Sequence, residues 1–234
     1  TYLLKGISGK YLYDDGFINL QDFVVGLFVA DIKFAGTMTK DQKLDFDIVA
    51  NNVDISKSPY LDRNLSIEGL LNVDGHIDGY VANPLFNGSV ESKELKINGE
   101  TYTDIAGNVN SDMKSVNTFD IGFKQPYKKA GLTTVAGEGV YSAKGNLDIV
   151  NQFLAGQVLI QNGDINGLLR TDKLDYAVEG NIDGKVDICP QGKGSGIVFE
   201  LSSHNLKTHD LTYDDFIAKG TFKNNVLKRL PRPI

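Results

Sequence analysis

The sequence predicts an all-β protein built from long, mostly antiparallel strands. Three observations support this prediction: apolar and polar residues alternate over long stretches, glycine is abundant, and helical spacing is scarce. Glycine accounts for 25 of the 234 residues, or about 11%, against roughly 7% in average chains. Because successive strand side chains point to opposite faces, alternation with a period of two indicates strands that have one apolar face.

Two long stretches, 67–81 and 176–188, show this alternation most clearly. In the first, the odd positions are apolar residues or glycine: Ile67, Gly69, Leu71, Val73, Gly75, Ile77, Gly79 and Val81. In the second, the even positions are Tyr176, Val178, Gly180, Ile182, Gly184, Val186 and Ile188. The opposite faces carry aspartates, among them Asp74, Asp78, Asp183 and Asp187. Fifteen extended residues would span roughly 50 Å, whereas typical strands have about five or six residues.

Shorter alternating stretches predict further strands in chain order. They lie at 32–38, 44–48, 119–123 and 216–222. The segment 149–156 could form a short helix, and this alternative stays open. The glycines on the apolar faces have two explanations. They allow a coiled sheet to curve, or they lower one wall so that a ligand fits.

An internal repeat underlies the pattern. The pentapeptide at 75–79 recurs at 180–184, an offset of 105 residues, and each copy is followed by a proline and then a glycine. Further on, 95–97 and 102–104 are echoed at 206–208 and 213–215, an offset of 111 residues. We therefore expect 67–110 and 176–222 to be equivalent, and 1–234 to be one continuous fragment of a longer repetitive array, because repeat arrays usually need caps that are not evident here.

The segment 75–99, GHIDGYVANPLFNGSVESKELKING, resembles the repeats of the TamB/AsmA-like family of the diderm bacterial envelope. In that family a glycine closes a strand, a proline follows about five residues later, and a second glycine precedes a new long strand. Gly79, Pro84 and Gly88 match this arrangement. Gly184, Pro190 and Gly194 match it with one extra residue. Stretches 44–56 and 145–150 also look like the family, so that the resemblance covers roughly 32–222.

The resemblance implies a β-taco, an elongated sheet of long strands curled into a half-pipe with an apolar interior groove. It also implies a periplasmic protein that is anchored in the inner membrane outside this fragment, carries phospholipid between the two membranes, and works with an outer-membrane barrel partner of the TamA type. A role in outer-membrane protein assembly belongs to the same family. The residues expected to line the lipid-binding groove are Ile67, Leu71, Val73, Ile77, Val178, Ile182, Val186 and Ile188.

Elementary energetics agree with such a groove. Exposing a lipid chain to water costs about 0.8 kcal/mol per CH₂. Two chains of ordinary length would therefore cost on the order of 20 kcal/mol, which forbids free diffusion between membranes. A continuous apolar trough lowers this cost along the whole path, while the headgroup stays in water at the open seam.

Catalytic and metal-binding functions are not expected. The three histidines are scattered, and His204 and His209 fall on opposite faces of a strand, which is poor geometry for one metal. Cys189 is the single cysteine. The loop 162–173 has Asn162 first and Lys173 twelfth, so it lacks the acidic ends of a calcium loop. We expect no enzyme, cofactor or metal.

Charge and composition limit the possible partners. The chain has 24 basic and 30 acidic residues, a net charge of −6, which argues against nucleic acid. No apolar run approaches the ~20 residues that span a bilayer. The first residue is Thr1 rather than methionine, which fits a processed or excised chain. Two alternatives remain. The first is an extracellular β-rich adhesin or carbohydrate-binding module, and the absence of tryptophan counts against it. The second is a glycan-active β-helix enzyme, which the long strands disfavour.

Overall fold

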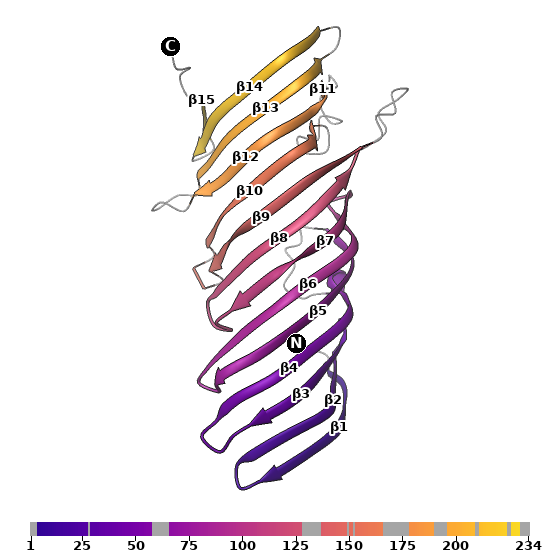
Figure 1. The fold of residues 1–234 in the computed structure, drawn as a ribbon, viewed down its shortest axis with the longest axis vertical. Helices are drawn as coiled ribbons and strands as arrows, with labels where there is room; N and C mark the ends of the chain where they lie inside the picture. The colour runs from indigo at the N-terminus through magenta and orange to yellow at the C-terminus, as the bar shows by residue number, and fades with distance from the viewer. Residues whose placement is uncertain are drawn as a thin grey trace. The chain divides into compact units, whose positions relative to one another are not determined.

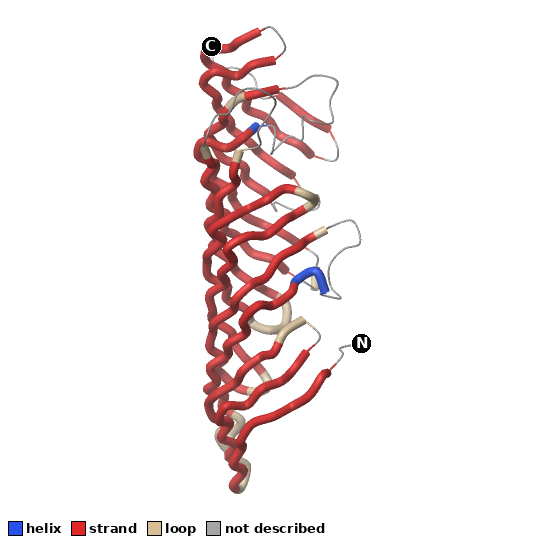
Figure 2. The backbone as a smooth tube through the Cα atoms, turned by 90° about the vertical axis from the view of Figure 1, so that its right-hand side faces the viewer, coloured by secondary structure: helices blue, strands red, loops and turns tan. Residues whose placement is uncertain are grey.

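A computed structural model describes most of the chain. The described residues are 4–27, 29–57, 66–127, 137–148, 150–151, 153–165, 178–189, 196–208, 211–223 and 226–229. Strands dominate this part of the chain (Figure 2). More than half of the 234 residues lie in strands. The prediction of an all-β protein with long strands is therefore confirmed.

Among the described residues, fifteen strands form one antiparallel sheet that is not closed, and nearly every strand pairs with the next one in the chain (Figure 1). The exception is β11, which pairs with β13. The first seven strands are β1 (Leu4–Asp14), β2 (Phe17–Leu27), β3 (Asp31–Met38), β4 (Lys43–Asp54), β5 (Ile67–Tyr80), β6 (Asn83–Ile97) and β7 (Glu100–Ser111). The others are β8 (Val116–Pro126), β9 (Glu138–Asp148), β10 (Phe153–Asp164), β11 (Val178–Glu179), β12 (Asn181–Cys189), β13 (Gly196–Thr208), β14 (Leu211–Lys223) and β15 (Val226–Arg229).

Within the described ranges, helical structure contributes little. A 3-10 turn, η1 (Ile55–Lys57), follows β4. The segment 149–156, for which a short helix was an open alternative, becomes strand β10 from Phe153 onward, while positions 149 and 152 lie outside the described residues. No helix in the described ranges is long and apolar enough to span a membrane.

The chain divides into two compact units. The first comprises 1–119 with 148–151, and the second comprises 120–147 with 152–234. The first unit therefore holds β1 to β7 and the beginning of β8. The second holds the rest of the strands, apart from the last residue of β9.

In the first unit, the pairing register places apolar residues beside one another on one face. One row runs across five strands: Leu20, Gly36, Phe46, Ile77 and Phe86. A parallel row runs through Val25, Ile32, Ala50, Val73 and Val90. The residues at alternate positions along each strand point to the other face, where Thr37, Asp45 and Asp78 form a polar row next to the first apolar row. The alternation seen in each strand is therefore in phase across the sheet.

Glycine allows close approach within this face. Gly36 has φ +141, and a Cβ there would collide with the backbone carbonyl of Asp45 on the neighbouring strand. At Gly75 and Gly88 a Cβ would meet the ring of Phe86. Protein atoms therefore already occupy the Cβ positions at all three glycines. At these sites glycine lets neighbouring protein atoms approach closely and leaves no direct room for a ligand.

Bulges bend the strands at equivalent places in the two units. Asn52 in β4 and Asn162 in β10 both have φ +55. The Asn52 amide donates to Asn72 Oδ1 at 3.0 Å, and the Asn162 amide donates to Asp183 Oδ1 at 2.7 Å. In each case a side chain of the next strand satisfies the amide that the bulge removes from the ladder.

The two hairpin systems share one register at an offset of 111 residues. Asn72 faces Glu91 as Asp183 faces Ser202. Leu95 likewise faces Tyr102 as Leu206 faces Tyr213. The 105-residue spacing of the glycine motif does not coincide with this register. Gly79 pairs with Pro84 beside a turn, whereas Gly184 pairs with Leu201 inside β12. Pro190 and Gly194 lie outside the described residues.

The second unit has a packed apolar cluster. Its buried members are Tyr141, Ile160, Ile165, Ile182 and Leu206. Phe123 stacks on Tyr141 with ring centroids 5.0 Å apart, and the Tyr141 hydroxyl donates to buried Gln125 Oε1 at 2.9 Å. A buried hydroxyl and amide that satisfy each other stabilise this packing without an orphaned polar group between them.

Candidate functional site: an apolar concavity in the first unit

The apolar face of the first unit is hollowed into a concavity of about 290 Å³. Five neighbouring strands and two turns contribute to it. The lining residues are Leu20, Phe34, Leu44, Phe46, Ile77, Val81, Pro84 and Met113. None of these side chains is ionisable or has a hydrogen-bonding oxygen or nitrogen. Water can enter the concavity, but the side chains around it offer no polar partner.

Two glycines lie at the centre of this lining in the strand register. Their lateral partners are Leu20 and Phe46 for Gly36, and Leu44 and Pro84 for Gly79. Ile77 precedes Gly79 in β5, and Val81 follows it in the turn to β6. The backbone requires glycine at both positions, since φ is +141 at Gly36 and +87 at Gly79. A Cβ would collide with the carbonyl oxygen of Asp45 at Gly36 and with that of Asn83 at Gly79, so glycine lets the neighbouring backbone approach closely at both positions.

The lining residues are neither fully buried nor fully solvated. Leu20, Phe34, Phe46 and Ile77 are each half-buried. Met113, in the turn between β7 and β8, is 51% exposed. A surface of this kind leaves apolar area in contact with water, so a ligand that covers it gains hydrophobic free energy of about 25 cal/mol per Å² buried. The chemistry favours an apolar chain and offers nothing for a polar headgroup.

Of the four groove residues predicted on β5, one lines the concavity. Ile77 lies in its wall. Val73, Leu71 and Ile67 are half-buried on the apolar side of the same strand, farther from the turn. They extend the apolar face beyond the concavity rather than forming its wall.

The four groove residues predicted in the second unit have a different environment. Ile182 is 3% exposed at the centre of the packed cluster. Val178 and Val186 pack against that cluster. Ile188 is half-buried opposite Ile197. Here the apolar face is covered by protein side chains, because the ring of Tyr141 and the isoleucines around Ile182 fill it.

The sequence pattern missed most of the concavity. Phe34, Leu44 and Phe46 belong to stretches whose alternation predicts strands, yet nothing within one strand indicates that they meet around Gly36. A glycine flanked by large apolar residues at two-residue spacing, as at 34–38, was the available signal. Met113 has no such signal, because it lies in a turn.

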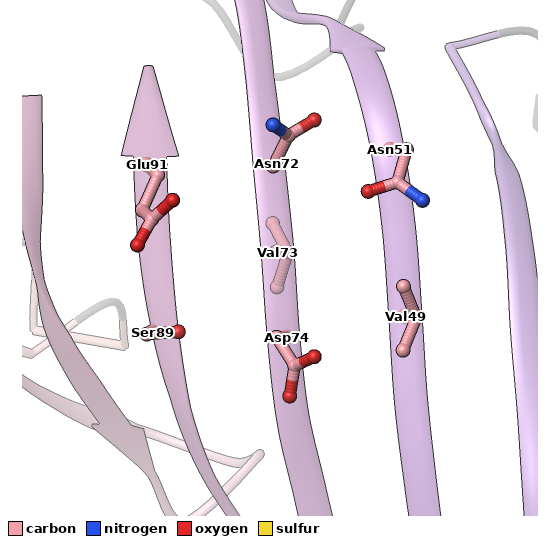
Figure 3. A pocket seen from close by; sticks show the side chains of 7 residues that line it. All are labelled: Val49, Asn51, Asn72, Val73, Asp74, Ser89 and Glu91. Carbon is pink, nitrogen blue, oxygen red and sulfur yellow. The ribbon is translucent and has the colours of Figure 1, made fainter.

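The opposite face carries a polar concavity of about 330 Å³ beside the β4 bulge (Figure 3). It is lined by Val49, Asn51, Asn72, Val73, Asp74, Ser89 and Glu91. Of these, Val73 belongs to the apolar row described above and lies between Asn72 and Asp74 along β5. Asn72 uses its side-chain oxygen to hold the bulge. Among the described residues, no group of three or more histidine, cysteine or carboxylate side chains is placed to hold a metal ion. Carboxylates on this face keep it hydrated.

The two histidines within the described ranges each lie beside an aspartate of a neighbouring strand. His76 Nδ1 lies 2.9 Å from Asp47 Oδ1, and its Nε2 lies 3.4 Å from Asp45 Oδ1. The hydrogen bond with Asp47 is the main cause that raises the pKa of His76, and the negative charge of Asp45 adds to it. His204 Nδ1 lies 2.8 Å from Asp215 Oδ1. His209 lies outside the described residues. These pairs join neighbouring strands on exposed faces.

Comparison with known proteins adds no relative: no family model, no curated protein and no solved structure matches the chain. A functional proposal for this chain therefore depends on its own residues and geometry, together with the resemblance of its glycine–proline motif.

Proposed function

We propose that the chain is a segment of a TamB/AsmA-like envelope protein that shields phospholipid acyl chains during transport between the inner and outer membranes. The observation that carries the proposal is the apolar concavity on one face of the first unit, whose eight lining side chains are all apolar and which remains unfilled by the described residues. A half-pipe curvature of the sheet is part of the proposal. So are the periplasmic location and an inner-membrane anchor outside this fragment.

The size of the concavity supports a lipid chain over a compact polar ligand. Small-molecule sites usually enclose about 300–1,000 Å³ and combine an apolar lining with a few placed polar groups. The concavity is near the lower limit of that range, at about 290 Å³, and has no polar side chain. Part of one alkyl chain can occupy it, with about 0.8 kcal/mol gained for each CH₂ removed from water.

The character of the contacts suits a carrier. Hydrophobic contacts are non-directional, so one position holds a sliding chain about as well as the next. Val73, Leu71 and Ile67 continue the apolar face along β5, beyond Ile77. The aspartates Asp74 and Asp78 on the other face favour water. Lipid would follow the apolar face while its headgroup remains hydrated. An outer-membrane barrel of the TamA type is the partner this proposal names, with assembly of outer-membrane proteins as a related role.

A non-catalytic adhesin or carbohydrate-binding module is the second candidate. Exposed aromatic side chains favour it, because Tyr11 and Tyr13 on β1 stand open to solvent. Aromatic rings of this kind can stack on sugars. The open sheet does not match the closed sandwich expected of such a module.

Site-specific photocrosslinking tests the proposal. A photoreactive residue replaces Phe46 inside the concavity, and the matched control replaces Leu12, an exposed apolar residue of the first unit whose neighbours in register are polar. The chain is expressed in a diderm bacterium, irradiated in cells, purified, and analysed by lipid mass spectrometry. We expect phospholipid adducts at position 46 and few at position 12. Equal labelling at the two positions, or none at either, contradicts lipid binding; adducts to glycan favour the second candidate.

A further inference from the structure

One lining residue of the apolar concavity comes from outside the five strands and the β5–β6 turn that form the rest of it. Met113 lies in the turn between β7 and β8, and its side chain contributes to the lining while remaining 51% exposed. Its φ is +52, in the left-handed region where glycine or asparagine would fit with less strain. The turn backbone by itself therefore does not favour methionine at this position.

The turn holds Met113 by several short-range hydrogen bonds. The Met113 amide donates to Ser111 Oγ at 2.8 Å. Asp112 Oδ1 accepts from the amides of Lys114 at 2.9 Å and Ser115 at 2.7 Å. Because side-chain oxygens satisfy three consecutive amides, the turn keeps one conformation in spite of the left-handed residue at its centre.

A further hydrogen bond joins this turn to the rim of the concavity. Lys114 Nζ donates to Asn83 Oδ1 at 2.5 Å. Asn83 is the first residue of β6 and precedes Pro84, which lines the concavity opposite Gly79. This hydrogen bond therefore joins the turn that carries Met113 to the first residue of β6, next to Pro84.

We infer that Met113 closes one end of the concavity and sets the length of alkyl chain that it accepts, an inference that rests on the proposed lipid-binding function. Methionine suits this role because its unbranched thioether side chain adapts its shape to an apolar neighbour. A residue held at a strained φ by its surroundings is a common sign of a functional constraint. The part of the ligand that contacts Met113 is an alkyl chain, because no lining residue has a polar side chain.

Chain-length profiles test the inference. A polyene fatty acid that fluoresces in apolar surroundings is bound to the purified chain and displaced by saturated fatty acids of increasing length. For wild type we expect the affinity to rise roughly fourfold per added methylene, and then to level off at a limiting length. Met113→Gly removes the wall and fits the left-handed φ, so its limit should move to longer chains. Met113→Trp should move the limit to shorter chains.

A matched turn variant and the melting temperature complete the test. Val150, exposed in the turn between β9 and β10, does not line the concavity, so Val150→Gly should keep the wild-type limit. Met113→Gly should melt no lower than wild type, since it relieves strain. If wild type and both Met113 variants share one limiting length, the inference is wrong while lipid binding stands. If wild type binds no fatty acid of any length, the proposed function and this inference both fail.

Discussion

Ile77→Asp should lower alkyl-chain binding with a small loss of stability, whereas Ile182→Asp should cause a large loss of stability. Ile77 is half-buried in the wall of the open apolar concavity, whereas Ile182 is 3% exposed at the centre of the packed cluster of the second unit. Both positions are predicted groove residues by sequence pattern. The structure gives one of them access to water and surrounds the other with protein.

The cost of Ile182→Asp follows from its surroundings. The variant loses the burial of an isoleucine side chain, about 1.5–3 kcal/mol. It also takes a carboxylate out of water among Ile160, Ile165 and Leu206, which adds several kcal/mol. A loss above roughly 5 kcal/mol is comparable to the whole stability of a marginal domain. We expect the second unit to unfold or to melt far below wild type.

The cost of Ile77→Asp is smaller, because its carboxylate can remain hydrated in the open concavity. We expect a loss of about 1 kcal/mol from the apolar area that Ile77 shares with its neighbours, and a fall in melting temperature of roughly 2–4 °C. Binding of an alkyl probe should fall strongly, since a charge in the wall repels an apolar chain.

Thermal melting followed by circular dichroism and fatty-acid probe binding measure the two effects on the same samples. The matched controls are Leu12→Asp in the first unit and Ile217→Asp in the second, because these residues are 58% and 67% exposed. Both controls should keep the wild-type melting temperature and binding. The reasoning is refuted if Ile77→Asp unfolds the protein as Ile182→Asp does, which would make the concavity part of a packed core. Unchanged probe binding by Ile77→Asp refutes it equally.

Two further predictions concern the scaffold. Gly36→Ala should destabilise the first unit by roughly 1–3 kcal/mol, because its φ is +141 and a Cβ would collide with the adjacent strand. Chemical denaturation measures this loss of stability. The control is Gly6→Ala, because a Cβ at Gly6 would meet nothing within 4 Å. Equal losses for the two variants would contradict the explanation by collision with the neighbouring strand. His76→Gln should cost more stability at acid than at alkaline pH, because the pKa of His76 is raised in the folded state by its aspartate partners. Its stabilising charge is fully present below the unfolded pKa of about 6.5 and is lost as the pH rises through the folded pKa. Melting curves of wild type and His76→Gln at about pH 5.5 and about pH 8.5 check this prediction. A difference in melting temperature between the two proteins that is larger at the higher pH would contradict it.

The alternation of residues determined most of the strand content. The stretch 67–81 predicts a strand, and β5 covers Ile67–Tyr80. The stretch 176–188 predicts another, but the structure divides its described part at Gly180, where φ is +145 and a Cβ would approach Asn205 O and Leu206 Cα at 3.2 Å. The alternation of apolar and polar residues along one strand is a local property, so it can be recognised in the sequence. The break at Gly180 depends on a neighbouring strand, which the local pattern does not include.

A period of two along each strand places Ile77 and Ile182 on apolar faces without knowledge of any neighbouring strand. What covers each face depends on the packing of strands that are distant in the chain. Lateral register brings Phe46 beside Gly36 and leaves an open hollow, while Ile182 meets Tyr141, Ile160 and Leu206 in a packed cluster. The physical reason is that a concavity arises from side chains distant in sequence, whose alignment is set by hydrogen-bond register and by bulges such as the one at Asn52.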